Sequence, residues 1–354
     1  MRGKGINYDT GFLNRGSSTR EPFDPEIVRG EMRIIREQLH CNAVRITGGD
    51  LNRLELAAKY AAAEGLEVWF CPFTNGLTQD ELLDLLADCA ERAERLRRAG
   101  ASIVLVTGSE LTMFTLGFLP GDTLEERLAL IADPTRVRPL IAALRKNFNE
   151  FLVRVVDAVR ARFGGKISYA SLPFEGVDWS RFDIISTDAG YRTRETPAQF
   201  RDQIRAFVAQ GRAMGKPVAI TEFGCMTFRG AAALGGSELT LIEWDSDGKP
   251  ARVKENLVRD ENEQATYLRE LLEVFDSEGV EYAFVYTFAR YDLPHHSDAE
   301  KDFDLTSRGI VKVVDNASLA RSGPYAGMPW QPKLAFNSLA EYGGATKSDA
   351  PNQR

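Results

Sequence analysis

Short apolar runs rich in β-branched and aromatic residues alternate along the chain with longer amphipathic stretches. Most of the runs are almost continuously apolar, which is typical of strands buried on both faces. Eight of them predict strands, at 4–8, 42–47, 66–73, 102–109, 166–172, 182–187, 217–222 and 281–288. The regular alternation of strand and helix predicts a parallel sheet with helical crossovers.

The amphipathic stretches carry helix boundary signals. Thr78 and Glu81 form a capping-box pattern, and Gly100 follows the helix that this pattern opens. No GxGxxG or GxxxxGK[ST] motif occurs, so the two common nucleotide-binding turns are absent from the sequence. We therefore expect an α/β fold, a closed (β/α)8 TIM barrel with enlarged loops after strands four, seven and eight. An open doubly wound sheet is the alternative.

The chain length suits one such barrel. With 354 residues, it exceeds the roughly 250 residues of a typical barrel by an amount that insertions in loops can supply. We expect a single barrel domain over 1–343 and a disordered C-terminal tail over 344–354. The enlarged loops are expected at 111–137, at 225–260 and after strand eight, where 302–312 is expected to cross the barrel mouth. The second loop is predicted to form a hairpin around a turn at 245–248.

Charge and cysteine usage narrow the classes of partner. The formal net charge of -7 argues against nucleic acid as a main partner, since phosphate binding needs a concentrated basic face. No apolar signal-peptide region and no membrane-spanning run is visible, so we expect a cytoplasmic protein without a membrane partner. The four cysteines lack CxxC spacing, and none of the three histidines ends a predicted strand. We expect no metal and no organic cofactor, which disfavours a metal-dependent hydrolase, while the oligomeric state stays open.

Two predicted strands end in a glutamate where the apolar run breaks into small and polar residues. Glu110 follows the fourth strand, and Glu222 ends the seventh. In a parallel barrel the C-terminal ends of all strands meet at one mouth, so these two carboxylates are expected to share a pocket. Such a pair can cleave a glycosidic bond when one carboxyl group is protonated and the other is ionised.

In this arrangement the chain resembles the retaining glycoside hydrolases whose barrels carry the acid/base on strand four and the nucleophile on strand seven. The TEFG motif at 221–224 is similar to that clan's nucleophile strand, and Ser109-Glu110 stands in the place of its acid/base motif. The resemblance covers 4–292. It implies that Glu110 acts as general acid and then base, that Glu222 is the nucleophile, and that the substrate is a carbohydrate or glycoside.

Two positions depart from the pattern of that clan. Ser109 stands where the clan usually has an asparagine that helps hold the sugar 2-hydroxyl, so either the substrate is unusual or activity is lost. Tyr286 stands near the place of a tryptophan platform, and it is expected either to stack on the sugar or to be a core aromatic residue. These departures leave open a catalytically inactive barrel that serves as a carbohydrate-binding or interaction module.

Several polar or aromatic residues are candidates to support the glutamates or bind substrate. Arg45 lies in an apolar strand and needs a carboxylate partner. The resemblance implies that this partner is Glu222, whose pKa a nearby guanidinium would lower. Tyr191 follows strand six, where the family commonly has a residue that contacts the nucleophile. The remaining rim candidates, each with a structural role as its alternative, are Asn7, Tyr8, Trp69, Glu175, Asp188 and Asp292.

Overall fold

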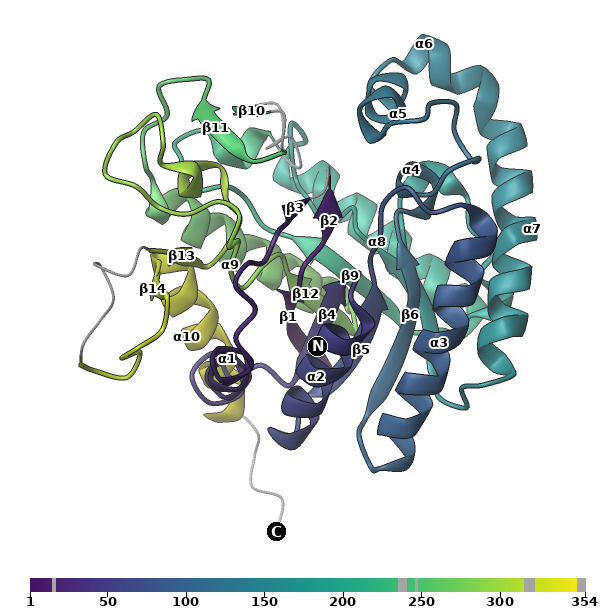
Figure 1. The fold of residues 1–354 in the computed structure, drawn as a ribbon, viewed down its shortest axis with the longest axis horizontal. Helices are drawn as coiled ribbons and strands as arrows, with labels where there is room; N and C mark the ends of the chain where they lie inside the picture. Colours follow the sequence, from purple (N-terminus) through teal and green to yellow (C-terminus); the bar gives the residue numbers. More distant parts are fainter. Residues whose placement is uncertain (15–16, 235–240, 246–247, 315–321, 349–354) are drawn as a thin grey trace.

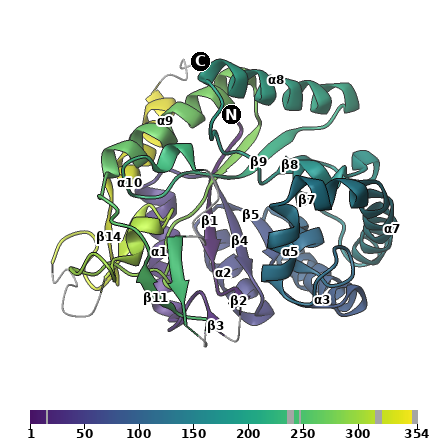
Figure 2. The ribbon, with the colours of Figure 1, turned by 90° about the horizontal axis from the view of Figure 1, so that it is seen from above.

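Eight parallel strands close into a barrel in the order β1-β4-β5-β6-β7-β8-β9-β12 (Figures 1 and 2). The computed structural model describes residues 1–354 except 15–16, 235–240, 246–247, 315–321 and 349–354. The barrel strands are β1 (Gly3–Asp9), β4 (Ala43–Gly48), β5 (Glu67–Pro72), β6 (Ile103–Ser109), β7 (Lys166–Ser171), β8 (Ile185–Thr187), β9 (Val218–Phe223) and β12 (Tyr282–Val285). Each lies within one residue of a predicted run or inside it, so the predicted (β/α)8 TIM barrel is confirmed.

Long helices surround the barrel, as Figure 2 shows from above. They are α1 (Pro25–Glu37), α2 (Leu51–Ala63), α3 (Gln79–Arg98), α7 (Ile141–Arg160), α8 (Pro197–Met214), α9 (Glu261–Glu278) and α10 (Leu334–Ser348). Thr78 caps α3 in the predicted capping box with Glu81. The crossover from β7 to β8 has the two 3-10 helices η2 (Pro173–Glu175) and η3 (Trp179–Arg181) in place of an α-helix.

Additional elements follow the C-terminal ends of four strands. After β1 come the short strands β2 (Leu13–Asn14) and β3 (Ser17–Ser18), and after β6 come α4 (Leu111–Phe114), α5 (Leu124–Ile131), α6 (Pro134–Val137) and η1 (Arg138–Leu140). After β9 come η4 (Ala231–Ala233), β10 (Ile242–Trp244) and β11 (Pro250–Val253), and after β12 come η6 (Phe303–Thr306), β13 (Val311–Val313) and β14 (Trp330–Pro332). Strands β10 and β11 pair antiparallel, which confirms the predicted hairpin, whose turn residues 246–247 lie outside the described residues. In Figure 1, α5 and α6 rise on one side of the upper end of the molecule and β11 on the other.

Aromatic side chains fill part of the barrel interior. Trp69 is fully buried, with its ring centroid 5.0 Å from that of Tyr282 and 4.8 Å from that of Phe284. Tyr282 is the first residue of β12, so this cluster lies toward the N-terminal ends of the strands. The interior is therefore a packed core rather than a pore, and polar chemistry is left to the opposite end.

A buried carboxylate connects α1 to distant parts of the chain. Glu31 accepts hydrogen bonds from Tyr8 Oη (2.5 Å), Arg20 Nη2 (2.7 Å), Tyr291 Oη (2.5 Å) and Trp330 Nε1 (2.8 Å). Its side chain has no exposed surface. Four donors replace the water that a buried charge loses, so this contact holds α1, β1, β14 and the segment after β12 together.

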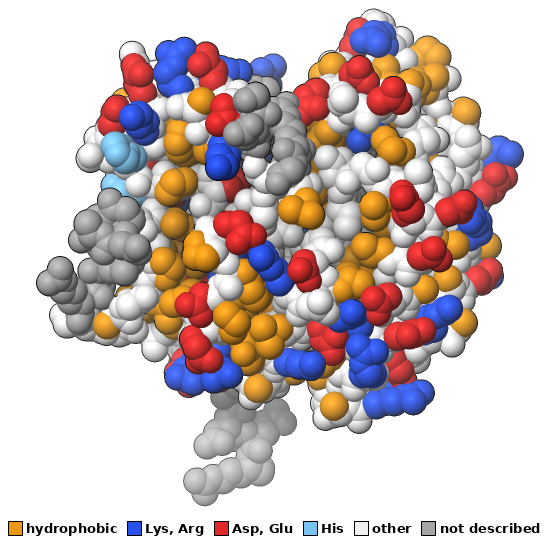
Figure 3. Space-filling view, in the orientation of Figure 1, with side chains coloured by type: hydrophobic (Ala, Val, Ile, Leu, Met, Phe, Trp, Pro, Cys, Tyr) orange, Lys and Arg blue, Asp and Glu red, His pale blue; other side chains and the backbone are white. Residues whose placement is uncertain are grey.

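Helix α10 ends the described part of the chain, and charged side chains lie on the surface. Helix α10 runs to Ser348 and so includes the first residues of the range expected to be a tail, while 349–354 lie outside the described residues. Basic and acidic side chains are interspersed over the face in Figure 3. Within the described ranges, no helix has the length and apolar character needed to cross a membrane.

Candidate active site

Glu110 and Glu222 lie at the C-terminal ends of β6 and β9, two barrel strands that β7 and β8 separate. Glu222 is the fifth residue of β9, and Glu110 directly follows β6, with its backbone nitrogen donating to Ala170 O of β7 at 3.0 Å. Glu110 also precedes the one-turn helix α4 and has a left-handed backbone conformation, with φ 49° and ψ 38°. This conformation costs a residue with a Cβ atom about 1–2 kcal/mol.

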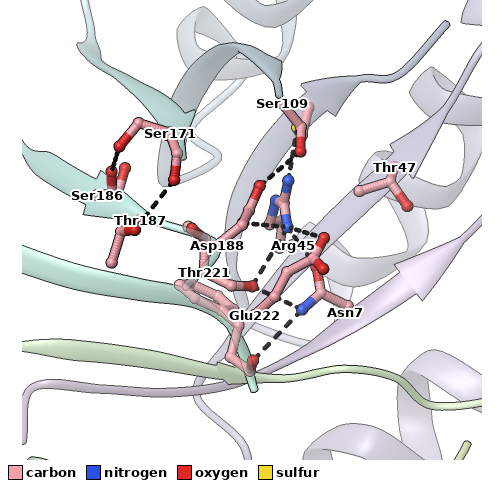
Figure 4. Close-up of polar contacts among 12 residues, drawn as sticks. Asn7, Arg45, Thr47, Ser109, Ser171, Ser186, Thr187, Asp188, Thr221 and Glu222 are labelled. Atoms are coloured by element: carbon pink, nitrogen blue, oxygen red, sulfur yellow. Dashed lines mark hydrogen bonds and ion pairs between the residues drawn. The ribbon is translucent and has the colours of Figure 1, made fainter. Parts of the chain in front are cut away.

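Arg45 on β4 contacts Glu222 and the polar groups around it (Figure 4). Its Nη1 atom donates to Glu222 Oε1 at 2.9 Å and to Asp188 Oδ1 at 3.3 Å. The same nitrogen donates to Asn7 Oδ1 at 3.0 Å and to Thr221 O at 3.2 Å. The arginine side chain has no exposed surface, so the expected contact between Arg45 and the carboxylate of Glu222 is present inside the protein.

Ser109, Asp188 and Asn7 belong to the same buried network. Ser109 Oγ donates to Asp188 Oδ2 at 2.6 Å, and Asn7 Nδ2 donates to Thr221 O at 2.8 Å. All three residues are at most 2% exposed. The polar atoms of these residues and of Arg45 are therefore bound to one another inside the protein, and their direct contact with substrate stays a prediction.

Two tyrosines reach from this network toward solvent. Tyr191 Oη donates to Glu222 Oε2 at 3.3 Å and accepts from Arg308 Nη1 at 3.1 Å. The Arg308 guanidinium lies 4.8 Å from the ring centroid of Tyr191 and 5.5 Å from that of Tyr286. Tyr191 and Tyr286 are both half-buried. They are thus the predicted substrate-binding residues that combine contact with the site and access to solvent.

Arg308 was not predicted. It lies between η6 and β13, in an irregular segment without periodicity, and only 5% of its surface is exposed. The sole signal in the sequence is a single arginine between Ser307 and Gly309 in a segment already expected to cross the mouth.

Two expected rim residues have partners outside the network of Arg45. Trp69 is buried in the barrel interior, and its Nε1 donates to Glu67 Oε1 at 3.1 Å near the start of β5. Asp292 forms a two-bond ion pair with Arg290, at 2.8 and 2.7 Å. Trp69 is therefore too deep to contact substrate, and the carboxylate of Asp292 is occupied by its neighbour.

Glu175 supports the segment that follows Glu110. It accepts hydrogen bonds from Thr112 Oγ1 at 2.7 Å, Tyr169 Oη at 2.8 Å and Leu172 N at 2.7 Å. Thr112 N adds a fourth bond at 3.3 Å, so the carboxylate is attached directly to α4. Burial raises the pKa of Glu175 to about 7, and the hydrogen bonds to its ionised form oppose that rise.

The two candidate catalytic carboxyl groups both titrate above their usual range. Burial, then the charge of Asp188, raises the pKa of Glu222 to about 7, and Arg45 and Arg308 oppose this rise. Burial and the charges of Asp188 and Glu222 raise the pKa of Glu110 well above its ordinary value. Arg45 lowers the pKa of Glu222, as expected, but desolvation and the charge of Asp188 outweigh the guanidinium, so the net shift is upward.

The cysteines and the acidic and histidine side chains were considered as possible metal ligands. The four cysteines are buried free thiols, and Cys71 Sγ accepts from Arg45 Nη2 at 3.5 Å. In the part of the chain that the structure describes, no group of three or more His, Cys, Asp or Glu side chains could hold a metal ion.

No protein-family model matches the sequence, and no curated protein matches it. Solved structures do match the fold. A complex of a GH113 β-1,4-mannanase has a TM-score of 0.60 at 16% identity, covering 98% of this chain and 100% of that one. A GH113 β-mannanase from Alicyclobacillus acidocaldarius has a TM-score of 0.57 at 16% identity, covering 97% of each chain. A Parabacteroides merdae β-glucuronidase has a TM-score of 0.52 at 13% identity, covering 97% of this chain and 36% of that one. At such identities, the likeness establishes a shared fold.

Proposed function

We propose that this protein is a retaining glycoside hydrolase in which Glu110 is the acid/base and Glu222 the nucleophile. The observation that carries the proposal is the pair of carboxyl groups with raised pKa values at the C-terminal ends of β6 and β9, above the buried network of Arg45. The named activities of the fold neighbours, two of them GH113 mannanases, accord with it.

Glu222 has the surroundings that a carboxylate nucleophile requires. Arg45 holds Oε1 and the hydroxyl of Tyr191 holds Oε2, so the carboxylate has a fixed orientation. In the proposed first step, Glu222 attacks the anomeric carbon as the bond to the leaving oxygen breaks, and Glu110 gives that oxygen its proton. In the second step, Glu110 takes a proton from water, which attacks the same carbon and releases Glu222.

The relative pKa values suit this division of roles. The pKa of Glu110 lies well above its ordinary value, and that of Glu222 is about 7. Around neutral pH, part of the protein therefore has ionised Glu222 and protonated Glu110, which is the reactive combination. The left-handed backbone of Glu110 accords with a functional role, because such strain is often retained where it positions a reacting group.

The half-buried aromatic rings suggest how the sugar is held. The faces of Tyr191 and Tyr286 can stack on the apolar C–H face of a sugar ring, with Arg308 beside both rings. We propose a glycoside substrate and take β-1,4-mannan oligosaccharides, together with aryl glycosides including furanosides, as the first compounds to assay.

Glu222→Ala tests the nucleophile. The variant should lose turnover of an activated aryl glycoside, and added azide should restore it by forming a glycosyl azide of inverted configuration, identified by NMR. Glu91→Ala is the matched control, because Glu91 lies on the outer helix α3 in an exposed ion pair with Arg162. Unchanged turnover by Glu222→Ala, or rescue with retained configuration, would remove the assignment.

Glu110→Ala tests the acid/base. Glycosides with poor leaving groups should lose far more activity than those with good ones, because good leaving groups need little protonation. The measurement is kcat/KM across a series of aryl glycosides whose phenols differ in acidity. An equal loss across the series would contradict the role.

A further inference from the structure

Asp188 is a third carboxylate in the candidate site, and solvent does not reach it. Its side chain has no exposed surface, although it lies directly after β8 at the barrel mouth. Asp188 Oδ1 and Glu222 Oε1 accept from the same nitrogen, Arg45 Nη1, at 3.3 and 2.9 Å (Figure 4). Ser109 Oγ binds the other oxygen of Asp188 at 2.6 Å. Asp188 and Glu222 therefore compete for one buried cation.

Negative groups outnumber positive ones around this cation. The charged and titratable residues that act on Asp188, the two glutamates and Arg45 come from several barrel strands and the segments after them. They are Glu110, Glu175, Asp188, Glu222, Arg45, Arg308, Cys71 and Tyr191. Arg308 is the second cation, and its Nη1 atom is bound to the hydroxyl of Tyr191.

A shared guanidinium stabilises each carboxylate less than it would stabilise one alone. A buried negative charge also favours the protonated forms of acids nearby, because little water screens it. The charge of Asp188 acts in this way on both Glu110 and Glu222, as the largest contribution after burial.

We propose that Asp188 is a positioning residue. It shares the guanidinium of Arg45 with Glu222 and so sets the pH range in which Glu110 and Glu222 share one proton. This inference rests on the proposed function for its catalytic meaning. It also gives Ser109 a role, since the hydroxyl fixes the carboxylate of Asp188 rather than contacting a sugar.

Asp188→Asn separates the charge of Asp188 from its hydrogen bonds. The amide oxygen can still accept from Arg45, and its NH2 group can donate to Ser109 Oγ, so shape is kept while the charge is removed. Both limbs of the kcat/KM profile should move to lower pH by about one pH unit, because Glu222 gains the whole guanidinium and Glu110 loses a negative neighbour. A merely structural Asp188 would leave both limbs in place, which would overturn the proposal.

Asp183→Asn is the matched control. Asp183 precedes the same strand at its other end, where its carboxylate accepts from Arg160 Nη2 and from the backbone nitrogen of Ile167. This variant removes one negative charge from the same segment, away from the barrel mouth. Its pH profile should match that of the unaltered protein, and a shift as large as that of Asp188→Asn would overturn the proposal.

A second readout does not depend on turnover. In protein labelled with 13C at glutamate carboxyl carbons, the signals of Glu110 and Glu222 are assigned with Glu110→Gln and Glu222→Gln. Both should titrate at lower pH in Asp188→Asn. If the unaltered protein cleaves no glycoside, the proposed function fails while this titration still decides the effect of Asp188.

The folded state of the variants is checked by circular dichroism and thermal unfolding. If Asp188→Asn does not fold, Asp188→Ser repeats the titration, since its small hydroxyl also removes the charge. Failure of both to fold, beside a folded Asp183→Asn, would assign Asp188 a purely structural role and overturn the proposal.

Discussion

Replacing Arg45 with glutamine should change both stability and the pH dependence of activity. Arg45 is fully buried, and its Nη1 atom alone binds Glu222, Asp188 and Asn7. The shorter, neutral amide leaves the buried carboxylate of Asp188 and the partly buried carboxylate of Glu222 without the charge of Arg45. Removing one partner of a buried ion pair typically costs about 3–5 kcal/mol of unfolding free energy.

The effect on activity follows from the protonation of Glu222. Its pKa is about 7, so about half of the protein has ionised Glu222 at pH 7. Loss of a guanidinium neighbour raises a carboxyl pKa by about one to three pH units, which would lower kcat/KM at pH 7 by about 5- to 500-fold. Activity should recover as pH rises, until Glu110 loses its proton.

The assay is kcat/KM for an aryl glycoside measured across pH in the unaltered protein, Arg45→Gln and Arg45→Lys. Lysine keeps the charge and loses the planar fork. The fall of kcat/KM at acid pH in Arg45→Lys should therefore lie between those of the unaltered protein and Arg45→Gln. Arg154→Gln, at an exposed arginine on α7, controls for loss of a surface charge. An acid limb at the same pH in Arg45→Gln would refute the reasoning.

Three further changes test separate parts of the structure. In the unaltered protein, kcat/KM should fall about 50-fold from pH 7 to pH 5 as Glu222, with a pKa of about 7, is protonated; a fall centred near pH 4 would contradict this. Glu175→Gln should lose about 2 kcal/mol in urea unfolding, because an NH2 group must face a donor where the carboxylate accepts from Leu172 N; equal stability would mean that this bond contributes nothing. Gly190→Ala should lose about 1–3 kcal/mol and lower kcat, because its Cβ would overlap Ile220 Cγ2 and the Glu222 carbonyl; full activity would show that β9 tolerates the shift.

The fold could be predicted because a buried parallel strand appears in the sequence as a short apolar run between amphipathic stretches. The ends of the strands could be predicted less accurately. The run at 281–288 contains β12 only to Val285, because apolar composition does not show where regular pairing stops. The crossover between β7 and β8 also lacks the expected helix, and there the short segment contains Pro173 and Gly176, which disfavour a regular helix.

Site residues could be predicted where a charged side chain occurs in an otherwise apolar strand. Arg45 is a charge in an apolar strand, and the structure gives it the carboxylate partner that this implies. Trp69 could not be placed, because the alternation of a strand indicates the face of a side chain and not its depth along the barrel axis. Arg308 lies in an irregular segment, and the partner of Ser109 depends on how closely β6 and β8 approach inside the barrel.

The buried carboxylate of Glu31 has a consequence for biosynthesis. Its donors lie as far apart in the chain as Tyr8 and Trp330. During translation, α1 emerges early, yet the indole that gives its carboxylate a fourth hydrogen bond lies 299 residues further along the chain than Glu31. The nascent chain therefore cannot give this carboxylate all four donors until Trp330 has been made, and a chain truncated before position 330 would leave one acceptor of a buried side chain unsatisfied.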